Sequence, residues 1–176
     1  MTIVQMLLKE LNDESQVTRK MLERVPEDKF AWRPHEKSMT MMQLTTHIAE
    51  LPGWVAMAVT TDGLDFATMP YQPTVVNSTA ELLELFEKSL EEGRSKLAEA
   101  DDEKLEESWI LRNGEQILMT DTKGGTVRMS LSQIIHHRAQ LGVYLRLLNV
   151  PIPGTYGPSA DEDMGMTVGE ANEMNA

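Results

Sequence analysis

Residues 132–149 read SQIIHHRAQLGVYLRLLN, and this stretch is the best starting point for predicting the architecture of the 176-residue chain. Its apolar side chains recur at the spacing of one helix face, through Ile134, Leu141 and Leu148. The spacing predicts an amphipathic helix over roughly residues 130–149 that packs against other helices.

Two adjacent histidines, His136 and His137, stand in the middle of this helix. Neighbouring residues on a helix point about 100° apart, so the two rings cannot face one point. His137 lies on the more apolar face, with Gln133 and Leu141, and we expect it to point inward. His136 shares its face with Gln140 and is expected to support the packing of the helix.

A first helix is predicted at residues 2–24, where Glu14 and Thr18 interrupt the apolar stripe on its inward face. A second helix is predicted to begin near Ser38 or Thr40, since serine and threonine are good residues for capping a helix N-terminus. The chain thus begins with two helices in succession.

The second helix carries His47 in the middle of its apolar stripe, and Pro52 predicts a kink or a restart one turn later. The third helix is predicted to begin at Ser78, which forms a capping box with Glu81. Gly93 falls on the apolar stripe of this third helix, where its missing side chain allows another backbone to come close.

A small β-structure is predicted between the third and fourth helices. Residues 109–120, WILRNGEQILMT, alternate around Asn113 and Gly114, a strong signal for a two-residue hairpin turn. Residues 122–127, TKGGTV, predict a further turn, and residues 60–79 predict a loop. Four helices of about 20 residues predict an all-α fold, a four-helix bundle with a small β-hairpin excursion.

The composition fits one globular domain, predicted at residues 1–160 and followed by an irregular tail at residues 161–176. Hydrophobic residues make up 41% of the chain and charged residues 25%, which is enough to bury a core. The chain has no cysteine, which excludes disulfides and thiolate metal sites and fits a cytoplasmic location.

The charge and hydropathy exclude two classes of partner. The net charge is −12 and the basic residues are scattered among acids, so nucleic acid is not an expected partner. No apolar run reaches the ~18 residues that a membrane-spanning helix needs.

Inward histidines on two helices suggest a metal site, because bundle cores commonly hold metals between facing helices. His47 and His137 are the candidate ligands, and imidazole suits Zn, Ni, Fe or Cu. The alternative is that both rings are core residues bonded to backbone carbonyls. Gln133 is either a weak third ligand or the second member of an S-x-x-Q capping box that starts at Ser130.

Three other polar side chains have weaker claims. Arg138 is placed to pair with a carboxylate from another helix, and Tyr144 is placed to hydrogen-bond near the pocket. His35 lies in a connection beside a proline and is expected to be exposed.

With these residues assembled, the chain resembles the DinB / YfiT-like family, which is often described as a family of metal-dependent hydrolases. The resemblance rests on FAWRPHEKSMTMMQLTTHIAELPGW at residues 30–54, IIHHRAQLGVYLRLLNVPIP at 134–153, GTYGPSADE at 154–162 and the order of the four helices. It implies an up-down-down-up bundle, often a homodimer.

The resemblance also implies a metal site with one histidine from the second helix and an H-x-x-x-H or E-x-x-x-H pair from the fourth. These positions fall on His47, on His137 and, for the first member of the pair, on Gln133, where the family usually has histidine or glutamate. Family members with assigned activity resemble thiol-dependent transferases and isomerases that act on low-molecular-weight thiols such as bacillithiol or mycothiol.

The leading hypothesis is a metal-dependent enzyme of hydrolase or thiol-dependent transferase type that acts on a small-molecule substrate or a low-molecular-weight thiol. Its cofactor is a divalent metal, Zn, Ni or Fe. Its candidate ligands are His47, Gln133 and His137, and its candidate supporting residues are His136, Arg138 and Tyr144. The alternatives are a small-ligand-binding bundle that has lost tight metal binding through Gln133, and a structural dimer with both histidines in the core.

Overall fold

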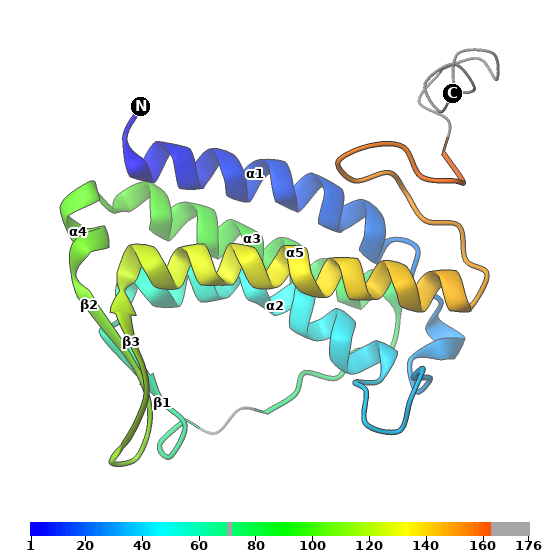
Figure 1. The fold of residues 1–176 in the computed structure, drawn as a ribbon, viewed down its shortest axis with the longest axis horizontal. Coiled ribbons are helices and arrows are strands. Elements are labelled where there is room, and N and C mark those ends of the chain that lie inside the picture. Colours follow the sequence, from blue (N-terminus) through cyan, green and yellow to red (C-terminus); the bar gives the residue numbers. More distant parts are fainter. Residues whose placement is uncertain (70–71, 163–176) are drawn as a thin grey trace, which may run out of the picture.

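The computed structural model of the chain describes residues 1–69 and 72–162 (Figure 1). Within these ranges the chain forms four long helices, α1 (Ile3–Leu22), α2 (Met41–Thr60), α3 (Thr79–Glu99) and α5 (Lys123–Leu147). Shorter elements are a 3-10 turn (Glu27–Lys29), α4 (Asp102–Glu106) and the strands β1 (Gly63–Asp65), β2 (Ser108–Asn113) and β3 (Gln116–Thr122). The predicted all-α four-helix bundle is confirmed.

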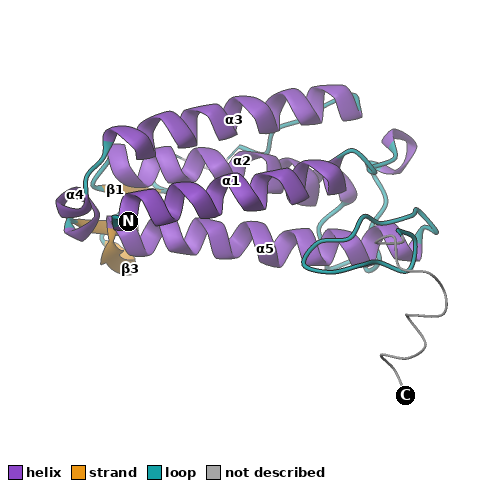
Figure 2. Cartoon of the chain, turned by 90° about the horizontal axis from the view of Figure 1, so that it is seen from above, coloured by secondary structure: helices purple, strands orange, loops and turns teal. Residues whose placement is uncertain are grey.

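The helices are arranged up-down-down-up, as the resemblance implies. α1 and α5 run in one direction, and α2 and α3 run in the other (Figure 1). Two consecutive parallel helices need a connection that returns along the bundle, which is why residues 61–78 are long. The strands and α4 lie at one end of the bundle, and the segment after α5 lies at the other (Figure 2). No helix in the described ranges is long and apolar enough to cross a membrane.

Side-chain caps fix where the helices begin. At α2, the Thr40 hydroxyl accepts from the Gln43 amide N–H at 3.2 Å, and the Gln43 side chain accepts from the Thr40 N–H at 2.9 Å. At α3, Ser78 accepts from the Glu81 N–H, while the Glu81 carboxylate accepts from Asn77 instead of from the cap. Thr40 is therefore the cap of α2, and half of the capping box predicted for α3 is formed.

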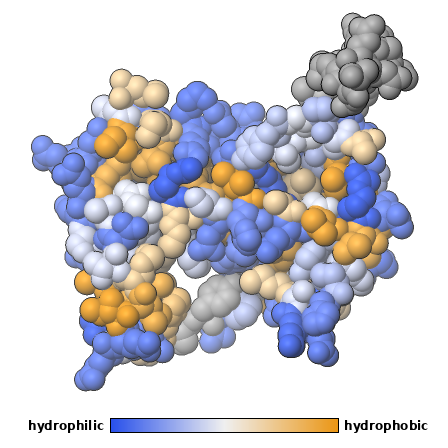
Figure 3. Space-filling view, in the orientation of Figure 1, coloured by the Kyte–Doolittle hydropathy of each residue, from blue (hydrophilic) through white to orange (hydrophobic). Residues whose placement is uncertain are grey.

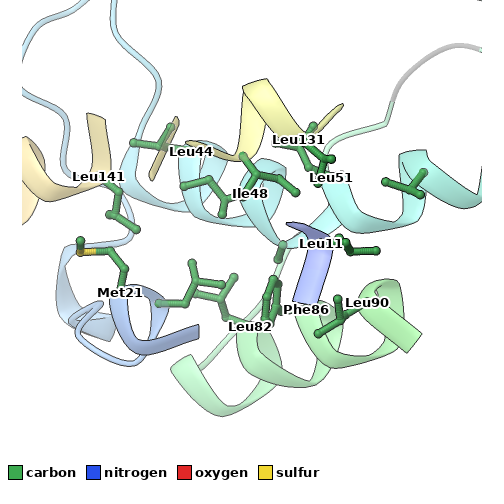
Figure 4. Packing of buried hydrophobic residues seen from close by; sticks show 14 of the residues in the cluster. Leu11, Met21, Leu44, Ile48, Leu51, Leu82, Phe86, Leu90, Leu131 and Leu141 are labelled. Carbon is green, nitrogen blue, oxygen red and sulfur yellow. The ribbon is translucent and has the colours of Figure 1, made fainter. Parts of the chain in front are cut away.

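The core lies between the four long helices, where apolar side chains from each helix point toward one another (Figure 4). Every long helix supplies fully buried members, which include Leu11 of α1, Ile48 of α2, Phe86 of α3 and Leu131 of α5. Burial of a side chain of this size contributes about 1.5–3 kcal/mol, so the apolar stripes account for most of the driving force of folding.

α2 and α3 approach closely at Gly93. A Cβ atom added to Gly93 would lie 2.3 Å from the backbone oxygen of Pro52, so only glycine fits at this contact. The prediction that Gly93 admits another backbone is confirmed. α2 continues through Pro52 to Thr60 as one helix, so of the two predicted alternatives, a kink or a restart, the restart is wrong.

α5 begins earlier than predicted, at Lys123 and not near Ser130. The stretch predicted as a turn is its first turn, where the Thr122 hydroxyl accepts from the Gly125 N–H at 3.0 Å. Because Ser130 then lies inside the helix and donates to a carbonyl one turn earlier, it caps nothing. The capping role considered for Gln133 is therefore wrong, and its side chain is free for other contacts.

The predicted hairpin joins β2 and β3, but its two-residue turn is Gly114 and Glu115, one residue later than predicted, because Asn113 ends β2 and pairs with Gln116. Gly114 has a positive φ of 59°, which such a turn needs at its first position. A third strand, β1, lies in the stretch predicted as a loop and pairs in parallel with β2, with Gly63 opposite Ile110. Exposed Ile117 and Leu118 belong to β3, and Figure 3 shows hydrophobic residues gathered over this hairpin. The sheet thus extends from one end of the bundle, and Trp109 of β2 is the one residue of β1, β2 and β3 that is buried.

Candidate functional site

Three polar side chains from α2 and α5 converge at one point. The Oε1 atom of Gln133 lies 3.4 Å from Nε2 of His47 and 3.3 Å from Nε2 of His137. The centroids of the two imidazole rings are 4.7 Å apart. The structure therefore brings together the three side chains that the sequence singled out as candidate ligands.

The helices position these side chains at the rim of the core. Gln133 and His137 are four residues apart and share one face of α5, which packs against α2. His47 is half-buried and directly precedes Ile48, which is fully buried. Rigid packing on one side and solvent on the other leave the convergent point within reach of a small molecule.

A chain of hydrogen bonds orients His137 from behind. Its Nδ1 lies 3.0 Å from Oε1 of Gln140, and Nε2 of Gln140 lies 3.0 Å from Nε2 of exposed His136. An amide oxygen can only accept, so in this arrangement Nδ1 of His137 carries the ring proton. His136 thus supports the site through Gln140, at one remove from the convergent point.

The same arrangement leaves Nε2 of His137 as a lone pair directed at Gln133. Burial lowers the pKa of His137; the hydrogen bond that His137 donates to Gln140 opposes this shift, and the charges of His47 and His136 reinforce it. The ring is therefore neutral near pH 7. Two acceptors, Nε2 of His137 and Oε1 of Gln133, then face one another at 3.3 Å, a contact that a cation would make favourable.

The donor set fits a divalent cation in distance and in type. Ligand bonds of about 2.0–2.1 Å at tetrahedral angles place neighbouring donors about 3.3–3.4 Å apart, the separation found around Gln133. Across residues 1–69 and 72–162, no group of three or more His, Asp or Glu side chains is placed to hold a metal ion. The candidate set is accordingly two imidazoles and one amide oxygen.

Two pockets flank the histidine pair. The first, which we call the Trp54 pocket, has a volume of about 340 Å³ and is lined by Met39, Gln43, His47, Trp54, Phe66 and Pro73. The second, the Tyr144 pocket, has a volume of about 370 Å³ and is lined by Ser38, Met39, His137, Gln140, Val143 and Tyr144. One histidine opens onto each pocket, which gives a ligand two ways to approach the convergent point.

Tyr144 lies where the sequence predicted, beside the candidate site. Its hydroxyl donates to the backbone oxygen of Met39 at 3.2 Å, and its ring meets Trp32 edge to face with centroids 5.6 Å apart. These contacts connect α5 to the segment before α2, so Tyr144 holds the wall that the two pockets share.

Arg138 lies elsewhere, because it follows His137 and points about 100° away, toward α1. Its Nη1 donates to Oε2 of Glu14 at 2.7 Å and to the Thr18 hydroxyl at 3.1 Å, and its side chain is only 2% exposed. The predicted pairing with a carboxylate is thus found, whereas the predicted place of Arg138 beside the histidines is wrong. The pair also explains why two polar residues interrupt the apolar stripe of α1.

The segment GTYGPSADE covers this buried ion pair. The Tyr156 hydroxyl lies 2.8 Å from Nη2 of Arg138, while Asp161 pairs with Arg146 and Glu162 with Arg24. The segment therefore lies on α1 and α5, away from the histidines, and ion pairs hold Asp161 and Glu162, the first two residues of the predicted tail. The remainder of the predicted tail, residues 163–176, lies outside the described residues.

Met39, Trp54, Phe66 and Gln140 are among the pocket-lining residues that sequence reasoning did not assign to the site. Two of them left a signal, since Trp54 lies seven residues after His47 and Gln140 lies three residues after His137. Met39 and Phe66 come from connections, whose course no helical periodicity predicts. His35 is exposed, as expected.

The fold and the sequence were compared with known proteins. A search of curated proteins finds no match. The structure is similar to a DinB-like protein from Bacillus subtilis, with a TM-score of 0.68 and 19% identity, covering 88% of this chain and 99% of that one. It is also similar to YfiT from Bacillus subtilis, a probable metal-dependent hydrolase with an unusual four-helix bundle topology, with a TM-score of 0.63 and 11% identity, covering 84% of this chain and 89% of that one.

A third similar structure is the mycothiol-dependent maleylpyruvate isomerase, with a TM-score of 0.55 and 14% identity, covering 81% of this chain and 63% of that one. At these identities the structural likenesses establish the fold. The sequence model of the DinB family matches residues 1–170, which is nearly the whole chain. The chain therefore belongs to the DinB family.

Proposed function

We propose that His47, Gln133 and His137 bind a divalent cation and that the chain is a metal-dependent enzyme of hydrolase or thiol-dependent transferase type. The observation that carries the proposal is the convergence of two imidazole Nε2 atoms on one amide oxygen, at 3.4 and 3.3 Å. The neutral state of His137 supports it, because imidazole binds metals in its neutral form.

The similar structures support the class of reaction. One is named as a probable metal-dependent hydrolase and another as a mycothiol-dependent isomerase. A small-molecule substrate or a low-molecular-weight thiol is the matching partner for this chain. The Trp54 and Tyr144 pockets, at about 340 and 370 Å³, have the size of small-molecule sites.

The residues around the proposed metal site have distinct roles. A divalent cation lowers the pKa of a water or thiol that binds to it and so supplies a nucleophile near neutral pH. Gln140 keeps the proton of His137 on Nδ1 and its lone pair on the side of His47 and Gln133. Trp54 packs its ring edge to face against His47, with centroids 5.6 Å apart, and limits the rotation of that imidazole.

The type of the third donor sets the expected affinity. An amide oxygen carries no charge, so Gln133 binds a cation more weakly than the histidine or glutamate that the family resemblance implies at its position. Zn, Ni and Fe all suit two imidazoles, and a site of this kind selects among them by geometry. We therefore expect moderate affinity and ready exchange of the metal.

Isothermal titration of Zn²⁺ into metal-free, untagged protein tests the proposal. We expect one site per chain that the His47→Ala and His137→Ala variants lose. His35→Ala is the matched control, because His35 is an exposed histidine away from the convergent point, and it should bind as the parent does. Binding that survives both site substitutions would contradict the proposal.

A second function, binding of a small ligand without turnover, is favoured by the amide at position 133. In that case Gln133→His would raise Zn²⁺ affinity sharply while the parent protein binds the metal only weakly. The homodimer that the resemblance implies and the cytoplasmic location stay predictions; sedimentation velocity and cell fractionation would test them.

A further inference from the structure

The lining of the Trp54 pocket is mostly apolar. Trp54, Phe66, Met39 and Pro73 form its walls, and among the described residues that line it only Gln43 and His47 are polar. No described Lys, Arg, Asp or Glu side chain lines this pocket. A charged group placed here would lose part of its hydration without meeting a counter-ion among these lining residues, which is unfavourable.

The volume limits what can enter. A cavity of about 150 Å³ is enough to hold benzene, so the Trp54 pocket, at about 340 Å³, has room for one ring and a short substituent. Met39 is unbranched and 42% exposed, and such a side chain adapts its shape to a ligand. Aromatic walls and a flexible methionine suit an aryl or branched alkyl group.

The pocket is continuous with the candidate site through His47. The His47 ring belongs to the pocket wall and lies 3.4 Å, through Nε2, from Gln133. A ligand whose apolar end fills the pocket therefore has its polar end beside the histidine pair. The Tyr144 pocket is less suited to an apolar group, because Ser38, His137 and Gln140 line it.

We propose that the Trp54 pocket binds the uncharged apolar part of the substrate, an aryl or branched alkyl group, and presents the substrate's polar end to His47. The reaction of that polar end rests on the proposed function, whereas binding of the apolar part does not. The expected substrate class is thus a neutral apolar compound with one polar reacting group, in preference to a carboxylate or an amine.

Nuclear magnetic resonance of the indole N–H groups tests this inference in metal-free protein. The chain has three tryptophans, so Trp32 and Trp109 serve as internal controls, and Trp54→Phe assigns the third signal. Benzyl alcohol, benzoate and benzylammonium are the probes. We expect benzyl alcohol to shift the Trp54 signal alone, and each charged probe to bind at least about tenfold more weakly.

Two variants sharpen the test. Phe66→Ala removes a wall and should weaken benzyl alcohol binding about tenfold, while Ile117→Ala, an exposed apolar truncation on β3, should leave it unchanged. Equal affinity for charged and neutral probes, or no shift of Trp54 at millimolar benzyl alcohol, would overturn the inference. If Zn²⁺ fails to bind while the Trp54 shift remains, the proposed function fails and the pocket assignment stands.

Discussion

Replacing Gly93 by alanine tests the packing that holds the helix of His47 in place. The added Cβ atom would lie 2.3 Å from the oxygen and 3.1 Å from the carbonyl carbon of Pro52. Both are backbone atoms of α2, so no side chain can rotate away to make room. The two helix backbones would have to separate by about 1 Å to restore ordinary contact.

Two opposing terms set the size of the effect. Alanine is favoured over glycine inside a helix by about 1 kcal/mol, which alone would stabilise the variant. Overpacking at a rigid contact costs about 1–3 kcal/mol or more, and here it acts on backbone atoms, so the upper part of that range applies. We expect Gly93→Ala to lower the free energy of unfolding by about 1–2 kcal/mol, and Tm by several degrees.

Urea denaturation followed by circular dichroism measures this difference. Gly53→Ala in α2 and Gly142→Ala in α5 are matched controls, because their added Cβ atoms would lie 3.7 Å from Ser89 and 3.8 Å from Met21, which is ordinary contact. Both controls should be stabilised by about 0.5–1 kcal/mol. A Gly93→Ala variant as stable as either control would refute the reasoning.

Four further outcomes follow from the contacts of the site and the core. Gln140→Leu should weaken Zn²⁺ binding about tenfold by titration calorimetry, because it removes the hydrogen bond that holds the ring proton of His137 on Nδ1. Gln133→Glu should raise Zn²⁺ affinity at least about tenfold in the same assay, because it adds a negative charge. Glu14→Gln leaves Arg138 charged and buried and should cost about 3–5 kcal/mol in urea denaturation, most of which Glu14→Leu with Arg138→Met avoids. In metal-free protein the free energy of unfolding should fall as the pH is lowered from about 6.5. The pKa of His137 is lower in the folded chain than in the unfolded chain, so the unfolded chain binds the proton first. His137→Gln should remove this part of the pH dependence.

The parts of the fold that the sequence predicted are those with local causes. Thr40 caps α2 through its own neighbours, and the hairpin between β2 and β3 closes within four residues, from Asn113 to Gln116, with Gly114 in its turn. The apolar stripes needed only helical spacing to be recognised. The close approach of another backbone at Gly93 could be predicted, because a glycine in the middle of an apolar stripe has few other structural roles.

The parts that were mispredicted depend on distant contacts. The glycines after Lys123 suggested a turn, yet they continue the helix because the Lys123 side chain is buried and pairs with Asp62 and Glu107. β1 has only three residues and exists because β2 lies beside it. Arg138 was expected to support the site, whereas its carboxylate partner is Glu14 of α1, because the sequence does not say which neighbouring helix holds the matching carboxylate.

The candidate site could be predicted only in part, because some of its residues are placed by local helical spacing and others by distant contacts. Gln133 and His137 are four residues apart on one helix, which predicted that they share a face, and the apolar stripe around His47 predicted that His47 points inward. The Trp54 pocket could not be predicted from the sequence, because Phe66 and Met39 reach it from the connections on either side of α2. Its lining depends on how those connections fold back over the bundle.

X-ray absorption at the zinc edge of reconstituted protein tests the proposed metal site most directly. The account predicts one Zn²⁺ per chain, with nitrogen and oxygen ligands at about 2.0–2.1 Å and the scattering of two imidazoles. His47→Ala or His137→Ala should each remove one imidazole from that signal, and His35→Ala should leave it unchanged. A zinc ion with no imidazole in its shell, or one whose signal ignores both site substitutions, would contradict the account.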